Sequence, residues 1–174
     1  PTRTRAGSDE REVAMDLVGH LRAQSTTLVD EATAAVARAE LTHYVRHGEE
    51  VTREHLRTLL ELTILCLEQR QLAPMVEHAE QIARERFAAG FGLEEVQTAF
   101  NVLEEAAWLH LVHEAPTDEL AQDLGLVATV LGAGKDQLAR TYVSLASHHQ
   151  APSLDMRALF DGVATHSIAN AHTP

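Results

Sequence analysis

Cysteine and long apolar runs are nearly missing from this sequence. Its 174 residues include one cysteine, Cys66, which excludes an intramolecular disulfide framework and any multi-cysteine zinc or iron–sulfur site. No apolar run reaches the roughly 18 residues that a membrane-spanning helix needs, and the N-terminus lacks the apolar segment of a signal peptide. We therefore expect a soluble, cytoplasmic protein with no membrane partner.

Positive charge is scarce as well. Lys135 is the only lysine, and 14 Lys and Arg residues stand against 26 Asp and Glu, for a formal net charge of −12. Nucleic acid is excluded as the main partner, because binding phosphates requires a positive surface. Hydrophobic residues make up 45% of the chain, which is enough for a core, and the length suits a single domain.

Strand signals are the third absence. No stretch alternates polar and apolar residues with an enrichment in Val, Ile, Thr and aromatics. Leu, Ala, Glu, Arg and Gln dominate instead, and all of them favour helices. The sequence predicts an all-α fold of five to seven helices over residues 8–149. A flexible N-terminus (1–7) precedes this domain, and a short helix with a polar tail (150–174) follows it.

Two helices are predicted before residue 48. Ser8 is a candidate N-cap for the first, whose apolar side chains recur four residues apart: Val13, Leu17 and Leu21. Thr27 with Asp30 resembles a capping pair for a second helix that ends near His47–Gly48. The pattern leaves open whether the two form one long rod.

The next predicted helix, 53–71, is apolar all round. Thr52 is its candidate N-cap, and its large aliphatic side chains point in nearly every direction: Leu56, Leu59, Leu60, Leu62, Ile64, Leu65 and Leu67. A helix of this kind has to be surrounded by protein. We expect it to be the central helix of the fold, with Cys66 buried.

Pro74 and Gly90 frame a fourth helix, because proline suits a first helical turn and glycine suits the left-handed residue that ends a helix. A two-residue connection leads to a fifth helix, which begins near Leu93 and ends before Pro116. The apolar stripe of this fifth helix is Val96, Phe100, Leu103, Ala107 and His110.

Residues 118–148 form the longest predicted helix. Its apolar side chains recur with heptad spacing, and Gly134 occupies one position of this seam. A helix of this length extends about 46 Å, against a diameter near 40 Å for a compact chain of this size, so it either breaks at Gly132 or Gly134 or projects beyond the body. A projecting apolar seam needs a partner, most often a second copy. The sequence therefore predicts a homodimer whose interface contains Leu124, Val127, Leu131, Leu138 and Tyr142.

Histidine is the chemical oddity, with eleven residues. The pairs His43/His47 and His110/His113 have helical spacing that could hold a metal, but each lacks a third ligand, and solvated or capping histidines are the better interpretation. Glu40 and His43 match one half of a di-iron motif that has no second copy. Because no nucleophile elbow, phosphate-binding loop or activated cysteine is present either, we expect neither an enzyme nor a bound metal or cofactor.

Aromatic side chains gather around the fourth and fifth helices. Phe87, Phe91, Phe100, Trp108 and His110 would line a small-molecule pocket if the two helices meet there. The same residues are equally consistent with plain core. For His110 alone, the favoured interpretation is a core histidine bonded to a carbonyl.

Residues 83–96, ARERFAAGFGLEEV, carry a family resemblance together with Phe100, Leu103 and Trp108. This helix–turn–helix resembles the N-terminal sensory domain of RsbR-type bacterial co-antagonist proteins, and helical domains that precede the output modules of PucR-like transcription regulators are similar. The likeness in helix order extends over roughly residues 10–148.

The resemblance implies an all-helical, globin-like domain without haem, usually dimeric, that passes a signal to an output domain or a signalling protein. It supplies no catalytic residues. The sequence stops soon after the helical domain, so the chain is either a free-standing relative or the sensory piece of a longer protein. We expect a non-enzymatic sensing and dimerisation domain of a stress-response or transcription-regulatory protein.

A globin-like fold keeps a haem- or small-ligand-binding sensor as the alternative, with its pocket near His110. Haem needs a histidine on an apolar helix face, and His78 or His110 could serve. His78, however, lies between Glu77 and Glu80, which favours the interpretation without haem.

Overall fold

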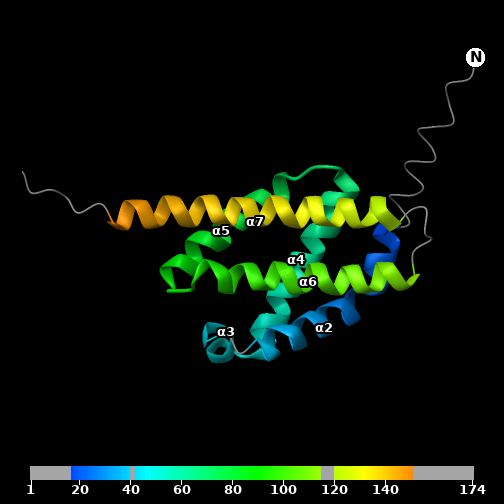
Figure 1. Ribbon diagram of the computed structural model, residues 1–174, viewed down its shortest axis with the longest axis horizontal. Helices are drawn as coiled ribbons and strands as arrows, with labels where there is room; N and C mark the ends of the chain where they lie inside the picture. The colour runs from blue at the N-terminus through cyan, green and yellow to red at the C-terminus, as the bar shows by residue number, and fades with distance from the viewer. Residues whose placement is uncertain (1–16, 40–41, 115–119, 151–174) are drawn as a thin grey trace, which may run out of the picture.

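A computed structural model describes residues 17–39, 42–114 and 120–150, and within these ranges the chain is entirely helical apart from short turns (Figure 1). Residues 17–23 form a helical segment. Six further helices follow along the described ranges: α2 (Ser25–Arg38), α3 (Thr42–His47), α4 (Glu49–Gln69), α5 (Ala73–Ala88), α6 (Leu93–Glu114) and α7 (Leu120–Gln150). The all-α prediction is confirmed. None of the described helices is both long and apolar enough to cross a membrane. The predicted Ser8 cap, the Pro116 stop and residues 151–174 lie outside the described residues.

Helix α4 is the centre of the fold, as its apolar circumference predicts. It contacts each of the other five labelled helices, and in Figure 1 it crosses behind α6 and α7, which run side by side in opposite directions. Cys66 is buried, as expected. Two of the predicted inward leucines, Leu62 and Leu65, are only partly buried, so one strip of α4 remains half open to solvent.

The helix boundaries before α4 differ from the prediction. α2 ends at Arg38, and the six-residue α3 occupies the stretch predicted to be its last turns. Thr27 lies inside α2, which begins at Ser25. The Gln24 amide still donates to the His20 carbonyl at 3.0 Å, so the segment 17–23 and α2 are separated by a turn of one residue.

The predicted Thr52 cap is also wrong, because α4 begins three residues earlier. Gly48 turns the chain with a φ of +87°, a conformation that glycine adopts without steric penalty. Glu49 and Glu50 then occupy the first turn, where negative charge favours the helix dipole. The Thr52 hydroxyl donates to the Gly48 carbonyl at 3.2 Å and is buried within the helix.

Helix α5 begins as predicted with Pro74 in its first turn. No side-chain hydrogen bond caps it. The buried face of α5 is Met75, Ala79 and Ala83, whereas Val76, Ile82 and Phe87 are half-buried.

Helix α7 is continuous over 31 residues, including both Gly132 and Gly134. Gly134 marks a close approach of the helix to its neighbours: a Cβ there would lie 2.5 Å from Cε1 of Phe100 and 3.1 Å from Sδ of Met75. Lys135, the single lysine, reaches across to α6 and donates to Glu104 at 2.6 Å. These contacts join α7 to α5 and α6 at mid-length.

Candidate functional site

The turn between α5 and α6 is the centre of the sequence segment that carries the family resemblance. Gly90 has a φ of +83°, its amide donates to the Phe87 carbonyl at 3.1 Å, and the Phe91 amide donates to the Arg86 carbonyl at 2.9 Å. This pair of hydrogen bonds with a left-handed glycine is the Schellman motif that ends helices. The predicted role of Gly90 as the terminator of this helix is confirmed.

Glu95 joins this turn to the rest of the molecule. Its carboxylate accepts the Gly92 amide at 3.1 Å, as the third residue of a capping box does. It also accepts the His43 amide at 3.3 Å and lies 2.7 Å from Nδ1 of the same histidine. A single carboxylate therefore caps α6 and holds α3 against it.

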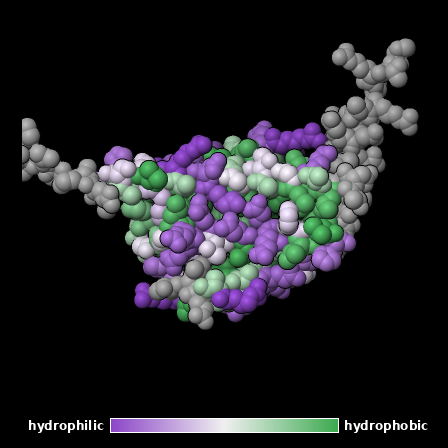
Figure 2. Space-filling model, viewed as in Figure 1, coloured by the Kyte–Doolittle hydropathy of each residue, from purple (hydrophilic) through white to green (hydrophobic). Residues whose placement is uncertain are grey.

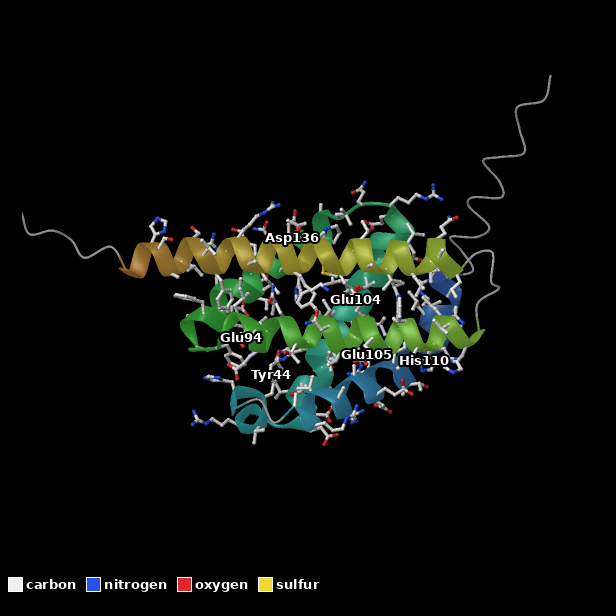
Figure 3. All side chains as sticks on the ribbon, viewed as in Figure 1. Tyr44, Glu94, Glu104, Glu105, His110 and Asp136 are labelled. Atoms are coloured by element: carbon white, nitrogen blue, oxygen red, sulfur yellow. The ribbon has the colours of Figure 1, made fainter. Side chains whose placement is uncertain are left out.

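Phe91 is the hydrophobic half of the same junction. Its buried ring stacks on the His43 ring at a centroid distance of 4.5 Å and meets the edge of Tyr44 at 5.8 Å. The Arg86 guanidinium lies 4.8 Å from the Phe91 centroid, a cation–π distance. Tyr44 lies between α3 and α6 in Figure 3.

Two further helices close the junction. The Tyr142 hydroxyl of α7 donates to the Phe91 carbonyl at 3.3 Å, and the Phe87 ring meets Tyr142 edge-on at 5.5 Å. Arg86 also lies 2.8 Å from Nε2 of His55 on α4. We call the cluster of His43, Tyr44, Arg86, Phe91, Glu95 and Tyr142 the turn junction; with His55 it brings together α3, α4, α5, α6 and α7.

The protonation states of the turn-junction side chains are those of structural contacts and not of a reactive group. Burial acts to raise the pKa of Glu95, but hydrogen bonds from the Gly92 amide and from His43 outweigh it and lower that pKa, so the carboxylate stays charged. Burial raises the pKa of Tyr44 to about 12 and that of Tyr142 to about 12, so both phenols stay neutral. The junction thus holds its helices together through a carboxylate that stays charged and two phenols that stay neutral.

These features can be set beside known proteins. The family model described as the RsbT co-antagonist protein rsbRD N-terminal domain matches residues 11–151. The chain belongs to this family. The resemblance to RsbR-type domains is confirmed, whereas the resemblance to PucR-like regulators stays a prediction. The comparison with curated proteins found no match.

In this rsbRD N-terminal domain the five predicted pocket residues do not converge. Phe91 belongs to the turn junction and Phe87 meets its Tyr142 edge-on, whereas Phe100 is buried at mid-length against Gly134. Trp108 is 51% exposed. α6 is 22 residues long, so residues at its two ends lie far apart. The order of the helices along the chain does not show which of these residues meet. The sequence interpretation as a shared aromatic pocket is therefore not supported.

His110 lies apart from the aromatic rings, on the side of α6 that faces α2 (Figure 3). Its Nε2 lies 3.1 Å from a Glu31 carboxylate oxygen, so its partner is a carboxylate and not the carbonyl expected of a core histidine. The surrounding groove, about 570 Å³, is lined by both helices: Glu31, Ala34, Ala35, Arg38, Val102, Glu105, Ala106, Leu109, His110 and His113. We call it the α2–α6 groove.

The five predicted dimer residues lie within the single chain. Val127, Leu131, Leu138 and Tyr142 are at most 7% exposed, and Leu124 is partly buried against the same core. Helix α7 packs its heptad seam on α5 and α6 of its own chain. The periodicity correctly indicates a buried seam, but these side chains are not a surface that a second copy could cover.

An exposed apolar surface lies elsewhere, and the sequence analysis missed it. Trp108, Leu109 and Val112 are 51%, 50% and 49% exposed on the last turns of α6, and we call them the α6 face. Figure 2 shows hydrophobic side chains gathered where α6 ends and α7 begins. The sequence does indicate such a surface, because the last turns of α6 are apolar on two opposite sides and only one side can face the core. The side that faces the core is Leu103, Ala107 and Leu111, all of which are buried.

The sequence favours solvated or capping roles for the two histidine pairs over metal sites. Within the described ranges no three His, Cys, Asp or Glu side chains are close enough to hold a metal ion. His43 is paired with Glu95 instead, and Glu40 lies outside the described residues.

Proposed function

We propose that this rsbRD N-terminal domain is a non-enzymatic stress-signalling sensor, spanning residues 8–149, that works as a homodimer and passes its signal to an output module or signalling protein. Family membership supports a role in a stress-response regulatory system. The turn junction supports a regulatory role over catalysis, because its polar groups are engaged in holding helices together.

The observation that carries this proposal is the α6 face. The last turns of α6 are apolar on both sides, with one side buried in the core and the other holding Trp108, Leu109 and Val112 at about half exposure. A helix segment apolar on both sides is stable in water only when its second side is covered. A second copy of the chain covers it symmetrically, because each copy presents the same surface to the other.

The dimer is tested by light scattering on the purified chain. The expected mass is about twice 19.1 kDa, and Trp108→Glu shifts it to the monomer value because the substitution places charge at the centre of the interface. Val143→Glu is the matched control: Val143 is 64% exposed but lies on α7. A monomer at high micromolar concentration, or a dimer that survives both Trp108→Glu and Leu109→Glu, overturns this part of the proposal.

The proposed sensor works without haem. A haem site needs an apolar slot beside its axial histidine, but His110 is paired with Glu31 in a groove that also contains Arg38 and Glu105. The absorbance spectrum after supplementation with haem is the test. A Soret band that disappears in His110→Ala or His78→Ala would establish the haem-binding alternative.

A further inference from the structure

A second cavity lies far from the turn junction, where the segment 17–23, the end of α4, the α4–α5 connection and the first half of α7 meet. Its volume is about 400 Å³, within the range of small-molecule sites. Its lining is Leu17, Cys66, Leu67, Arg70, Gln71, Leu72, Gln122, Leu126, Thr129 and Val130. We call it the α4–α7 cavity.

The floor of the α4–α7 cavity is apolar and the rim is polar. Leu17, Cys66, Leu67 and Val130 form the floor, and each is less than 10% exposed. The rim consists of exposed residues, most of which can hydrogen-bond: Arg70, Gln71, Leu72, Gln122 and Thr129. An apolar floor below hydrogen-bonding groups matches a ligand that has a hydrocarbon body and one polar end.

Charge on the rim has one sign. Among the residues that line this cavity, Arg70 alone is charged, although the chain as a whole carries a net charge of −12. A guanidinium has five donors and binds carboxylates in a fixed, often bidentate geometry. Arg70 has an interaction of its own, and the remaining donors of its guanidinium are complementary to an anionic group on a ligand. A cationic group has no charged partner among the lining residues.

The rim is also preformed by backbone contacts. Arg70 has a left-handed φ of 52° at the end of α4, and the Gln71 amide donates to the Cys66 carbonyl at 3.1 Å. The Arg70 amide donates to the Leu67 carbonyl at 3.4 Å as well. These bonds hold the rim to the end of α4, so a ligand does not have to order it on binding.

We propose that the α4–α7 cavity binds a small amphipathic carboxylate, with its hydrocarbon chain on the floor of Leu17, Leu67 and Val130 and its carboxylate at Arg70. This inference goes beyond the proposed function, since dimerisation through the α6 face requires no occupant here.

The test uses decanoate as the probe and the intact chain as the receptor. Isothermal titration gives one decanoate per chain, and decyltrimethylammonium, which has the same tail with a cationic head, binds at least tenfold more weakly. Arg70→Gln weakens decanoate binding by roughly tenfold, the usual loss for a hydrogen bond to a charged group. The affinity for decanol, which has no charge, stays unchanged in this variant.

Cys66 supplies an independent readout because it is the only thiol and lies in the floor. Burial raises its pKa, so its reaction with a disulfide reagent such as DTNB is slow. At a decanoate concentration ten times the dissociation constant, this reaction slows by about tenfold, as site occupancy requires. Unchanged thiol reactivity under bound decanoate overturns the proposed location.

A pair of neighbouring variants locates the site without disturbing the core. Thr129 and Ala128 are both exposed on α7, but only Thr129 lines the cavity. Thr129→Trp places a bulky ring over the mouth and abolishes decanoate binding, whereas Ala128→Trp leaves it unchanged. Equal affinity of both variants for decanoate, or equal affinity of the wild type for the carboxylate and the cation, refutes the proposal. Light scattering of the same samples reports the dimer separately, so failure of one proposal is distinguishable from failure of the other.

Discussion

The two helical glycines at the middle of α7 allow the packing of this fold to be tested by substitution with alanine. Gly134 faces Phe100 and Met75 so closely that an added Cβ would lie 2.5 Å from one ring carbon and 3.1 Å from the thioether sulfur. Gly132, two residues earlier in the same helix, has nothing within 4 Å of the same added atom. Gly134→Ala and Gly132→Ala therefore differ in packing while sharing the same change in helix propensity.

The expected magnitudes follow from these two terms. Replacing glycine by alanine inside a helix stabilises by about 0.5 to 1 kcal/mol, which is the whole effect for Gly132→Ala. Gly134→Ala gains the same amount but forces an extra methyl group into a closed core, at a cost of about 1 to 3 kcal/mol. Phe100 and Met75 are both buried, so neither side chain can swing into solvent to relieve the contact. The two variants should differ in free energy of unfolding by about 1 to 3 kcal/mol.

Thermal and urea unfolding of the two variants measure this difference. For a domain of this size, it corresponds to a separation in Tm of roughly 2 to 12 °C, with Gly132→Ala the more stable. Phe100→Leu removes the ring that Gly134→Ala would strike, so the double variant should be more stable than the sum of the single changes predicts. Equal stability of Gly132→Ala and Gly134→Ala would refute the close packing of α7 on α5 and α6.

Three further predictions concern the turn junction and the core. Glu95→Gln is less stable than the wild type at neutral pH, because folding lowers the pKa of Glu95 below its ordinary value of 4.5. The stability that the ionised Glu95 contributes is fully present above pH 4.5 and is lost as the pH falls through the lower pKa of the folded state. Urea unfolding across pH 2 to 7 checks it, with Glu94→Gln, at an exposed neighbour, as the control: this variant keeps Glu95 and should follow the pH dependence of the wild type. Tyr142→Phe removes the hydrogen bond to the Phe91 carbonyl and costs about 1 kcal/mol, measured in the same way; an unchanged midpoint would contradict that bond. Leu131→Asp and Leu138→Asp, both 0% exposed, unfold the chain instead of dispersing a dimer, because each buries an unpaired charge; a folded monomer by circular dichroism and light scattering would return these residues to the dimer interface.

The parts of the fold that the sequence predicts well are those set by side-chain periodicity. The apolar circumference of α4 predicts its central position, and the heptad spacing of residues 118–148 predicts the helical seam of α7. The same spacing leaves open a break at Gly132 or Gly134, which the continuous α7 does not have. The boundaries before α4 are less predictable because a backbone turn makes them. Gly48 carries no side-chain signal beyond being glycine, yet its φ of +87° sets the start of α4, while Thr52, a strong N-cap residue by type, lies inside the helix.

The candidate site is harder to predict, since periodicity shows that a face is buried but not what buries it. The seam of α7 is covered by α5 and α6 of the same chain, which spacing along one helix cannot distinguish from a second copy. The contact between His43 and Glu95 joins residues that are 52 positions apart, a separation beyond any local pattern. Such contacts depend on how the helices cross, and this is decided by the shapes of many side chains together.

The close contact at Gly134 also links the two proposed surfaces through the core. Val130, in the floor of the α4–α7 cavity, lies one turn before Gly134 on α7, and Phe100, which faces Gly134, lies about two turns before Trp108 on α6. Closely packed interiors transmit strain, so we expect a shift of α7 at the cavity floor to reach α6 through the contact at Gly134. Because α6 carries the face that we propose a second chain covers, this contact is where an effect of binding in the cavity on pairing at the α6 face should be sought.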